Sequence, residues 1–231
     1  MHSDIKLCYG DRDKALRSQQ VDYCMNALRI SPRYTSRNWQ VLDSSNPEDW
    51  SKAADVVRDR LDGRFLRFAS DCLKDTHSGF VVLAIDCLLA ETIQQFMDGV
   101  TNGHGRSAEM VKRFLKGKRF QPDFDAEARK AFYQDIRCGL LHQAEAKRMW
   151  LIRRRQPALL QKVADDQGYI VDVERFHAGL QDTLSDYLKL ISEPTSSLLR
   201  SNLWTKMNHI SSVRTARGAL YQAEGNTASA Q

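Results

Sequence analysis

The 231-residue sequence contains no apolar run that reaches the roughly 18 residues needed to span a membrane. The longest such run, from Phe80 to Ala90, is interrupted by Asp86. The first residues also lack the basic segment followed by an apolar one that is typical of a secretory signal. We therefore expect a protein that acts in the cytoplasm, without a membrane.

Clusters that would bind metals or phosphates are also missing. The five cysteines form no C-x-x-C pair, and their odd number argues against a disulfide framework. The six histidines do not cluster at ligand spacing, so no metal site is predicted. Gly99, Gly103 and Gly105 follow a predicted helix rather than a strand, which argues against a phosphate-binding glycine-rich loop. No cofactor is expected.

Helical periodicity is abundant. Apolar residues recur every three or four positions after Asn46-Pro47, which predicts a long amphipathic helix with a weak point at Asp62-Gly63. The helix that follows is apolar on nearly all sides, which is typical of a buried central helix. The predicted main helices span residues 46–72, 80–98, 107–117, 125–147 and 173–191.

Four to five main helices with short connections indicate an all-α helical bundle. The β-prone stretches at 149–152 and 169–171 predict a small two-stranded ribbon beside it. The predicted domains are a loop-rich N-terminal extension (1–45), the bundle (46–192), and a short amphipathic helix with a polar tail (193–231).

Basic residues gather in three places. Residues 106–119 hold six cations and one acid, residues 145–155 hold five and one, and residues 194–223 hold four and none. A solvated surface explains any one cluster. Three clusters that bracket the candidate segment 132–145, described next, favour a nucleic-acid partner. The predicted RNA-binding residues are Lys112, Arg113, Lys147, Arg148, Arg153 and Arg154.

The candidate chemistry lies in the segment F-Y-Q-D-I-R-C-G-L-L-H-Q-A-E, residues 132–145, in which Arg137 precedes His142 by five positions. Histidine can transfer a proton near neutral pH, and a forked guanidinium suits phosphate oxygens. The pair suits metal-independent RNA cleavage. In that reaction the ribose 2′-hydroxyl attacks phosphorus, leaving a 2′,3′-cyclic phosphate and a 5′-hydroxyl end.

This R-x4-H spacing, the apolar run 84–96, the basic helix and the stretch Trp150-Leu-Ile-Arg-Arg together resemble the HEPN superfamily over roughly residues 47–192. The resemblance implies an all-α bundle, commonly dimeric, and an endoribonuclease of a toxin–antitoxin or antiviral defence system. In such a dimer, two copies of His142 would share one cleft and serve as base and acid. The implied partners are RNA, a second copy of the chain, and an antitoxin or another protein encoded nearby.

Two alternatives stay open. Positions five apart on a helix lie about 140° apart, so Arg137 and His142 converge only if the helix starts or distorts near Gly139. Otherwise Arg137 pairs with an acid such as Asp135 or Glu91, and His142 is a surface residue. Cys138 stands where many active HEPN proteins have a polar residue, which favours a catalytically inactive module for dimerisation or for binding nucleic acid or a partner.

Other polar residues have supporting or structural interpretations. Glu91 lies on the polar strip of the central helix and is predicted to orient Arg137. Tyr133 is a candidate for stacking on an RNA base, and core packing suits it equally. Asp86 is interpreted as a buried, hydrogen-bonded carboxylate, and His177 as a structural residue.

Overall fold

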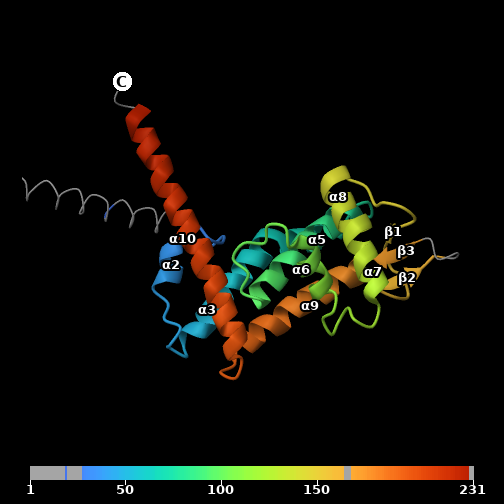
Figure 1. Cartoon of the computed structure of the whole chain (residues 1–231), viewed down its shortest axis with the longest axis horizontal. Coiled ribbons are helices and arrows are strands. Elements are labelled where there is room, and N and C mark those ends of the chain that lie inside the picture. Colours follow the sequence, from blue (N-terminus) through green and yellow to red (C-terminus); the bar gives the residue numbers. More distant parts are fainter. Residues whose placement is uncertain (1–18, 20–27, 164–167, 229–231) are drawn as a thin grey trace, which may run out of the picture. The chain divides into compact units, whose positions relative to one another are not determined.

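The computed structural model describes residue 19 and residues 28–163 and 168–228. Helices dominate these residues and a small sheet accompanies them, so the prediction of a mainly helical protein is confirmed (Figure 1). The chain forms two compact units, Met1–Arg60 with Met207–Gln231, and Leu61–Lys206. These divisions differ from the predicted boundaries at 45/46 and 192/193.

The first unit is formed by the two ends of the chain, residues 1–60 and 207–231. Its described helices are α2 (Ser36–Gln40), most of α3 (Asp49–Leu61) and the later part of α10 (Ser197–Ala228). Trp39 is buried, and its indole N–H donates to the Asn208 side chain at 2.7 Å. The Gln40 amide donates to Ser211 Oγ at 3.2 Å. Residues near 40 are therefore packed, and α10 is longer than the short helix predicted after residue 193.

The second unit contains the residues of the candidate site, and α5 lies at its centre. In chain order its elements are η1 (Asp62–Leu66), α4 (Arg67–Cys72), α5 (Gly79–Met97), α6 (Ser107–Phe114), α7 (Ala126–Ala131), η2 (Phe132–Arg137), α8 (Cys138–Gln143), β1 (Leu151–Arg153), β2 (Leu160–Lys162), β3 (Tyr169–Asp172) and α9 (Val173–Ser192), with the first part of α10. Helix α5 packs against α6 and α9, as its apolar sequence predicts.

Two π-helical turns, η1 and η2, interrupt the predicted helices. The first includes Gly63, at the predicted weak point. The second divides the predicted helix 125–147 into three parts, and within it the N–H of Cys138 donates to the Tyr133 carbonyl. Ala144 then ends α8 with a left-handed φ of 54°. Single π-helical turns inside helices frequently mark functional sites.

The sheet is larger than predicted. Both predicted stretches form strands, but β1 and β3 pair in parallel, and β2 adds an antiparallel edge, giving the order β1-β3-β2. Strand β2 escaped prediction because the short polar run Leu160-Gln161-Lys162 has no clear alternation of apolar and polar residues.

An aromatic cluster fills the second unit beneath η2. The Phe132 ring stacks on Phe176 of α9, with centroids 5.2 Å apart and an interplanar angle of 11°. Trp150 lies edge-on to Phe132 at 5.9 Å and contacts Tyr169 of β3 at 4.7 Å. These rings come from η2, α9 and the sheet, so their packing fixes the inner face of η2.

Helix α5 is the one described helix long and apolar enough to cross a membrane. Half of its most apolar window is buried inside the protein, and its buried Asp86 pairs with His177 of α9. Both properties are those of a core helix that packs against other helices.

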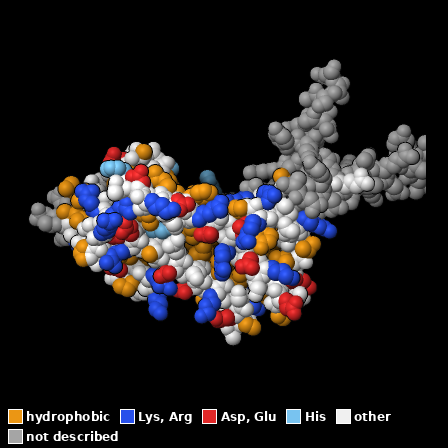
Figure 2. All heavy atoms as spheres, turned by 180° about the vertical axis from the view of Figure 1, so that it is seen from behind, with side chains coloured by type: hydrophobic (Ala, Val, Ile, Leu, Met, Phe, Trp, Pro, Cys, Tyr) orange, Lys and Arg blue, Asp and Glu red, His pale blue; other side chains and the backbone are white. Residues whose placement is uncertain are grey.

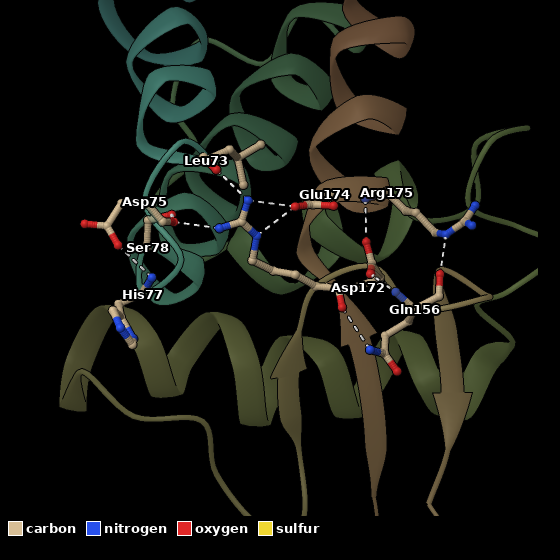
Figure 3. A network of polar contacts seen from close by, with 9 residues as sticks. Leu73, Asp75, His77, Ser78, Gln156, Asp172, Glu174 and Arg175 are labelled. Atoms are coloured by element: carbon tan, nitrogen blue, oxygen red, sulfur yellow. Dashed lines mark hydrogen bonds and ion pairs between the residues drawn. The ribbon is translucent and has the colours of Figure 1, made fainter.

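Arg154, which follows β1, joins three elements, and Figure 3 labels its partners Leu73, Asp75 and Glu174. Its guanidinium donates to Glu174 of α9 at 2.7 Å and to the carbonyls of Leu73 and Asp75 at 2.5 and 2.6 Å. Beside it, Asp172 accepts from the backbone N–H of Arg175 at 2.8 Å and caps α9. The Arg154 side chain is 17% exposed, so these contacts tie the sheet to α4 and α9.

Replacing Arg154 by Ala is expected to lower the free energy of unfolding by about 1–3 kcal/mol, because one carboxylate and two carbonyls lose their donor. The neighbouring Arg153→Ala is the matched control, since Arg153 is exposed and its one hydrogen bond to the described residues goes to the adjacent Ile152 carbonyl. The free energy of unfolding of Arg153→Ala is expected to differ from that of the wild type by no more than about 0.5 kcal/mol. Urea unfolding measures both, and equal stability of the two variants would contradict the structural role of Arg154.

Candidate functional site

Helices α5 and α6, η2 and the start of α8 bring together five polar residues, which we call the Arg137 cluster: Glu91, Ser107, Tyr133, Arg137 and Cys138. Arg137 Nη2 donates to Glu91 Oε2 at 2.9 Å, and the Ser107 hydroxyl donates to the same oxygen at 2.5 Å. The side chains of Arg137 and Glu91 are each 16% exposed. The predicted pairing of these two residues is therefore present, at the margin of the core.

The guanidinium of Arg137 is only partly used by this pairing. Its centre lies 5.7 Å from the centroid of the Tyr133 ring, within the range of a cation–π contact. Its Nε is buried and has no hydrogen-bond partner among the described residues. The guanidinium is thus held at Nη2 by Glu91 and lies over the Tyr133 ring.

Tyr133 belongs to the cluster rather than to the deep core, because it is half-buried. Burial raises the pKa of its hydroxyl, the nearby Ser107 opposes this rise, and the Cys138 thiol adds to it. The hydroxyl therefore stays protonated at neutral pH and can act as a hydrogen-bond donor. Cys138 lies inside the cluster, beside Tyr133, rather than on an open surface.

Local sequence explains why Arg137 points inward. Phe132 and Ile136 are buried, so the aromatic cluster holds one face of η2. Asp135 is also buried, and its carboxylate meets Arg148 Nε at 3.5 Å. The π-helical turn ends at Arg137, which places this side chain against α5 at the level of Glu91.

His142 is not brought into the cluster. It is exposed on α8, five positions after Arg137, and the residues between them form regular α-helix. Because five helical positions turn through about 140°, the two side chains diverge. The observed distortion, η2, ends at Arg137, and the regular helix that follows it does not produce the convergence near Gly139 that a single-chain site requires.

Gly139 shapes the loop after α8. An added Cβ at this position would lie 2.2 Å from the carbonyl oxygen of Glu145, so only glycine admits the returning chain. The backbone N–H of Lys147 then donates to the Asp135 carbonyl at 3.0 Å. The loop is thereby folded back against η2 and carries Lys147 beside α8.

The cations predicted to bind RNA differ in their exposure and in whether they are paired with an acid. Lys112 and Lys147 are half-buried, and Arg153 is exposed. Arg113 is paired with Asp98 at 3.0 Å, and Arg148 with Asp135. Arg154 is 17% exposed and is held by Glu174 and two backbone carbonyls.

On the face shown in Figure 2, Lys and Arg side chains are interspersed with acidic and apolar ones. A single dense basic patch is not visible there. Any contact with RNA phosphates on that face would therefore rely on a few separate cations rather than on a continuous basic surface.

Several polar partners have no signature in the sequence. Ser107, which shares Glu91 with Arg137, was not predicted, because it is sixteen positions away in the chain and on another helix. His177 was interpreted as structural, yet it contacts Asp86 at 2.8 Å and Ser70 at 2.9 Å. The one usable signal was Asp86 itself, since a carboxylate inside an apolar helix needs a partner from another element.

Among the described residues, no group of three or more His, Cys, Asp or Glu side chains is placed to hold a metal ion. Comparison with protein-family models, curated proteins and solved structures finds no match to this chain. The geometry of the site therefore carries the functional argument.

The Arg137 cluster predicts stability effects of different size for the two motif residues, Arg137 and His142. Arg137→Ala leaves the mostly buried Glu91 without its cation, and is expected to cost about 1–3 kcal/mol of unfolding free energy. His142→Ala removes an exposed side chain and is expected to change it by no more than about 0.5 kcal/mol. Thermal and urea unfolding measure both. A large loss in His142→Ala would show that His142 has a structural role that its exposure does not reveal.

Proposed function

We propose that the protein is a metal-independent endoribonuclease of the HEPN type that acts in the cytoplasm, in a defence or toxin-like system. The observation that carries the proposal is the Arg137–Glu91 ion pair, which holds a guanidinium at the margin of the core, on the element that leads into α8 and the exposed His142. Arg137 would stabilise charge on the phosphate oxygens, and Glu91 would fix its orientation.

A second copy of the chain is needed to complete this chemistry, because Arg137 and His142 diverge within one chain. In a two-fold dimer, one copy of His142 takes the proton of the ribose 2′-hydroxyl as its oxygen bonds to phosphorus. The other copy of His142 gives a proton to the departing 5′-oxygen. The net reaction leaves a 2′,3′-cyclic phosphate and a 5′-hydroxyl end.

The exposed face of α5 is suited to such a dimer. Val81 and Leu88 are 53% and 38% exposed, and Ala84 and Ile85 between them are half-buried. Their spacing forms an apolar stripe along one face of α5. The exposed Leu141 lies on α8, which contacts α5. Pairing of two copies through this stripe would bring their α8 helices toward one another.

Lys147 and Lys112 are the cations best placed to contact RNA. Neither has a charged partner among the described residues, and Lys147 lies beside α8 on the loop that Gly139 admits. Contacts from lysines of this kind go to phosphates, so they would strengthen binding without selecting a sequence.

A second candidate function is a catalytically inactive dimerisation or nucleic-acid-binding module, which pairs with an antitoxin or another protein. The exposure of His142, together with the placement of Cys138 inside the cluster, favours this alternative. The two candidates share the fold and differ in whether RNA is cut.

For the ribonuclease, the purified full chain is expected to cleave total RNA in the presence of a chelator and to leave 2′,3′-cyclic phosphate ends. His142→Ala should reduce the rate by about 100-fold or more, the usual contribution of general acid–base catalysis, while keeping the fold. Gln143→Ala, the exposed neighbour on α8, is the matched control and should cut at the wild-type rate.

Two results would reject the catalytic proposal. One is the wild-type rate in His142→Ala, which would place the activity elsewhere or in a contaminant. The other is RNA binding without cleavage by the intact dimer, which would favour the inactive module.

The dimer is expected to dissociate when the α5 stripe receives a charge. Leu88→Glu should sediment as a monomer at concentrations at which the wild type is dimeric, because the carboxylate would be desolvated at the interface. Leu190→Glu is the matched control, since Leu190 is 41% exposed and belongs to α9 rather than to α5. A wild type that is monomeric at high micromolar concentration, or a dimeric Leu88→Glu, would contradict this interface.

A further inference from the structure

A second polar network, unrelated to the Arg137 cluster, links three helices of the same unit. Ser70 of α4 lies 2.9 Å from His177 Nε2, and His177 Nδ1 lies 2.8 Å from Asp86 Oδ1 of α5. The serine thus meets one ring nitrogen and the carboxylate meets the other. This is the connectivity by which a serine, a histidine and an aspartate produce a nucleophile.

The three side chains differ in burial: Asp86 is the most buried and Ser70 the least. Asp86 is 0% exposed and His177 2% exposed, while Ser70 is half-buried and is followed on α4 by the exposed Asp71. The acid and the base are therefore shielded from water, and the hydroxyl lies at the margin of the unit. A nucleophile needs this order, because only its oxygen has to meet a substrate.

Gln181 adds a donor at the same oxygen. It lies one turn after His177 on α9, so the two side chains share a face of the helix. Its Nε2 donates to Ser70 Oγ at 3.0 Å. The amide thereby engages one lone pair of the Ser70 oxygen and restricts the orientations that the hydroxyl can adopt.

The single proton of the Ser70 hydroxyl has two acceptors. The Leu66 carbonyl and His177 Nε2 each lie 2.9 Å from Oγ. With the imidazole neutral and its Nδ1–H donated to Asp86, Nε2 is free to accept the proton and acts as a base. If the Ser70 hydroxyl donates to the Leu66 carbonyl instead, its hydrogen bond is the ordinary one of a serine inside a helix. The experiment below separates these two arrangements.

Burying the Asp86 carboxylate lowers the stability of the fold, and a purely structural role for Asp86 does not explain why it is there. Its second carboxylate oxygen is buried and lacks a hydrogen-bond partner in the part of the chain that the structure describes. Burial raises the pKa of Asp86, against the opposing effect of His177. A buried pair of this kind is often no more stabilising than apolar residues of the same volume. Its contact with a histidine that in turn meets a half-buried serine therefore favours a chemical role.

We propose that Ser70 is a nucleophile for acyl esters, with His177 as its base and Asp86 as the residue that positions the imidazole. Ser70 Oγ bonds to the ester carbonyl carbon and its proton passes to His177 Nε2. The bond to the leaving alcohol breaks and that oxygen takes the proton. Water then repeats the sequence on the acyl-serine, which releases a carboxylic acid and restores Ser70. This activity is independent of the proposed RNA cleavage.

The test uses a fluorophosphonate probe, which forms a covalent bond to activated serines, on the purified full chain. Intact mass should show one adduct, and peptide mapping should place it on Ser70. Ser70→Ala should abolish labelling. His177→Asn, which keeps an amide donor for Asp86 but removes the base, should slow labelling by about 100-fold or more. Hydrolysis of 4-nitrophenyl acetate should fall in parallel.

Ser192 of α9 is the matched control. It is more exposed than Ser70, and its hydroxyl also donates to the carbonyl four residues earlier, Leu188, at 3.3 Å. Ser192→Ala should be labelled at the wild-type rate. Circular dichroism confirms the fold of each variant. If a variant does not fold, mapping on the wild type still decides, because a folded wild type without an adduct on Ser70 overturns the proposal. Labelling of His177→Asn at the wild-type rate overturns it as well.

Discussion

The ion pair between Arg137 and Glu91 is the contact on which the candidate site depends. It joins η2 to α5 at the point where both side chains are only 16% exposed, so each charge relies on the other for compensation. Ser107 supplies the second donor to Glu91 and adds α6 to the same contact. The guanidinium is therefore held by three elements whose positions are fixed by apolar packing beneath them.

Helix α5 carries two carboxylates that serve different neighbours. Asp86 and Glu91 are five positions apart and so lie about 140° apart around the helix. Asp86 meets His177 of α9, and Glu91 meets Arg137 of η2. An apolar helix at the centre of a unit can hold two separate polar sites in this way, because each acid faces a different packed helix that supplies its partner.

The sequence predicted the helices well, because apolar periodicity and terminating residues are local properties. Helices α5, α6 and α9 begin and end within a few residues of the predicted bounds. The pairing of Glu91 with Arg137 was also predicted, from the polar strip on an apolar helix. The divergence of His142 follows from helix geometry and was one of the two alternatives left open by the sequence. The parallel pairing of β1 with β3 and the Ser70–His177–Asp86 network depend on tertiary packing between distant segments, which local patterns do not contain. The π-helical turn at η2 was missed because Phe132 to Arg137 continues a helical pattern without a break.

A double-mutant cycle on Glu91 and Arg137 tests the central claim most directly. The free energies of unfolding of the wild type, Glu91→Ala, Arg137→Ala and the double variant are measured in urea. If the ion pair organises the site, the double variant will lose less stability than the sum of the single losses, by about 1 kcal/mol or more. Losses that add to within about 0.3 kcal/mol would show that the two side chains do not depend on each other, and would contradict the account.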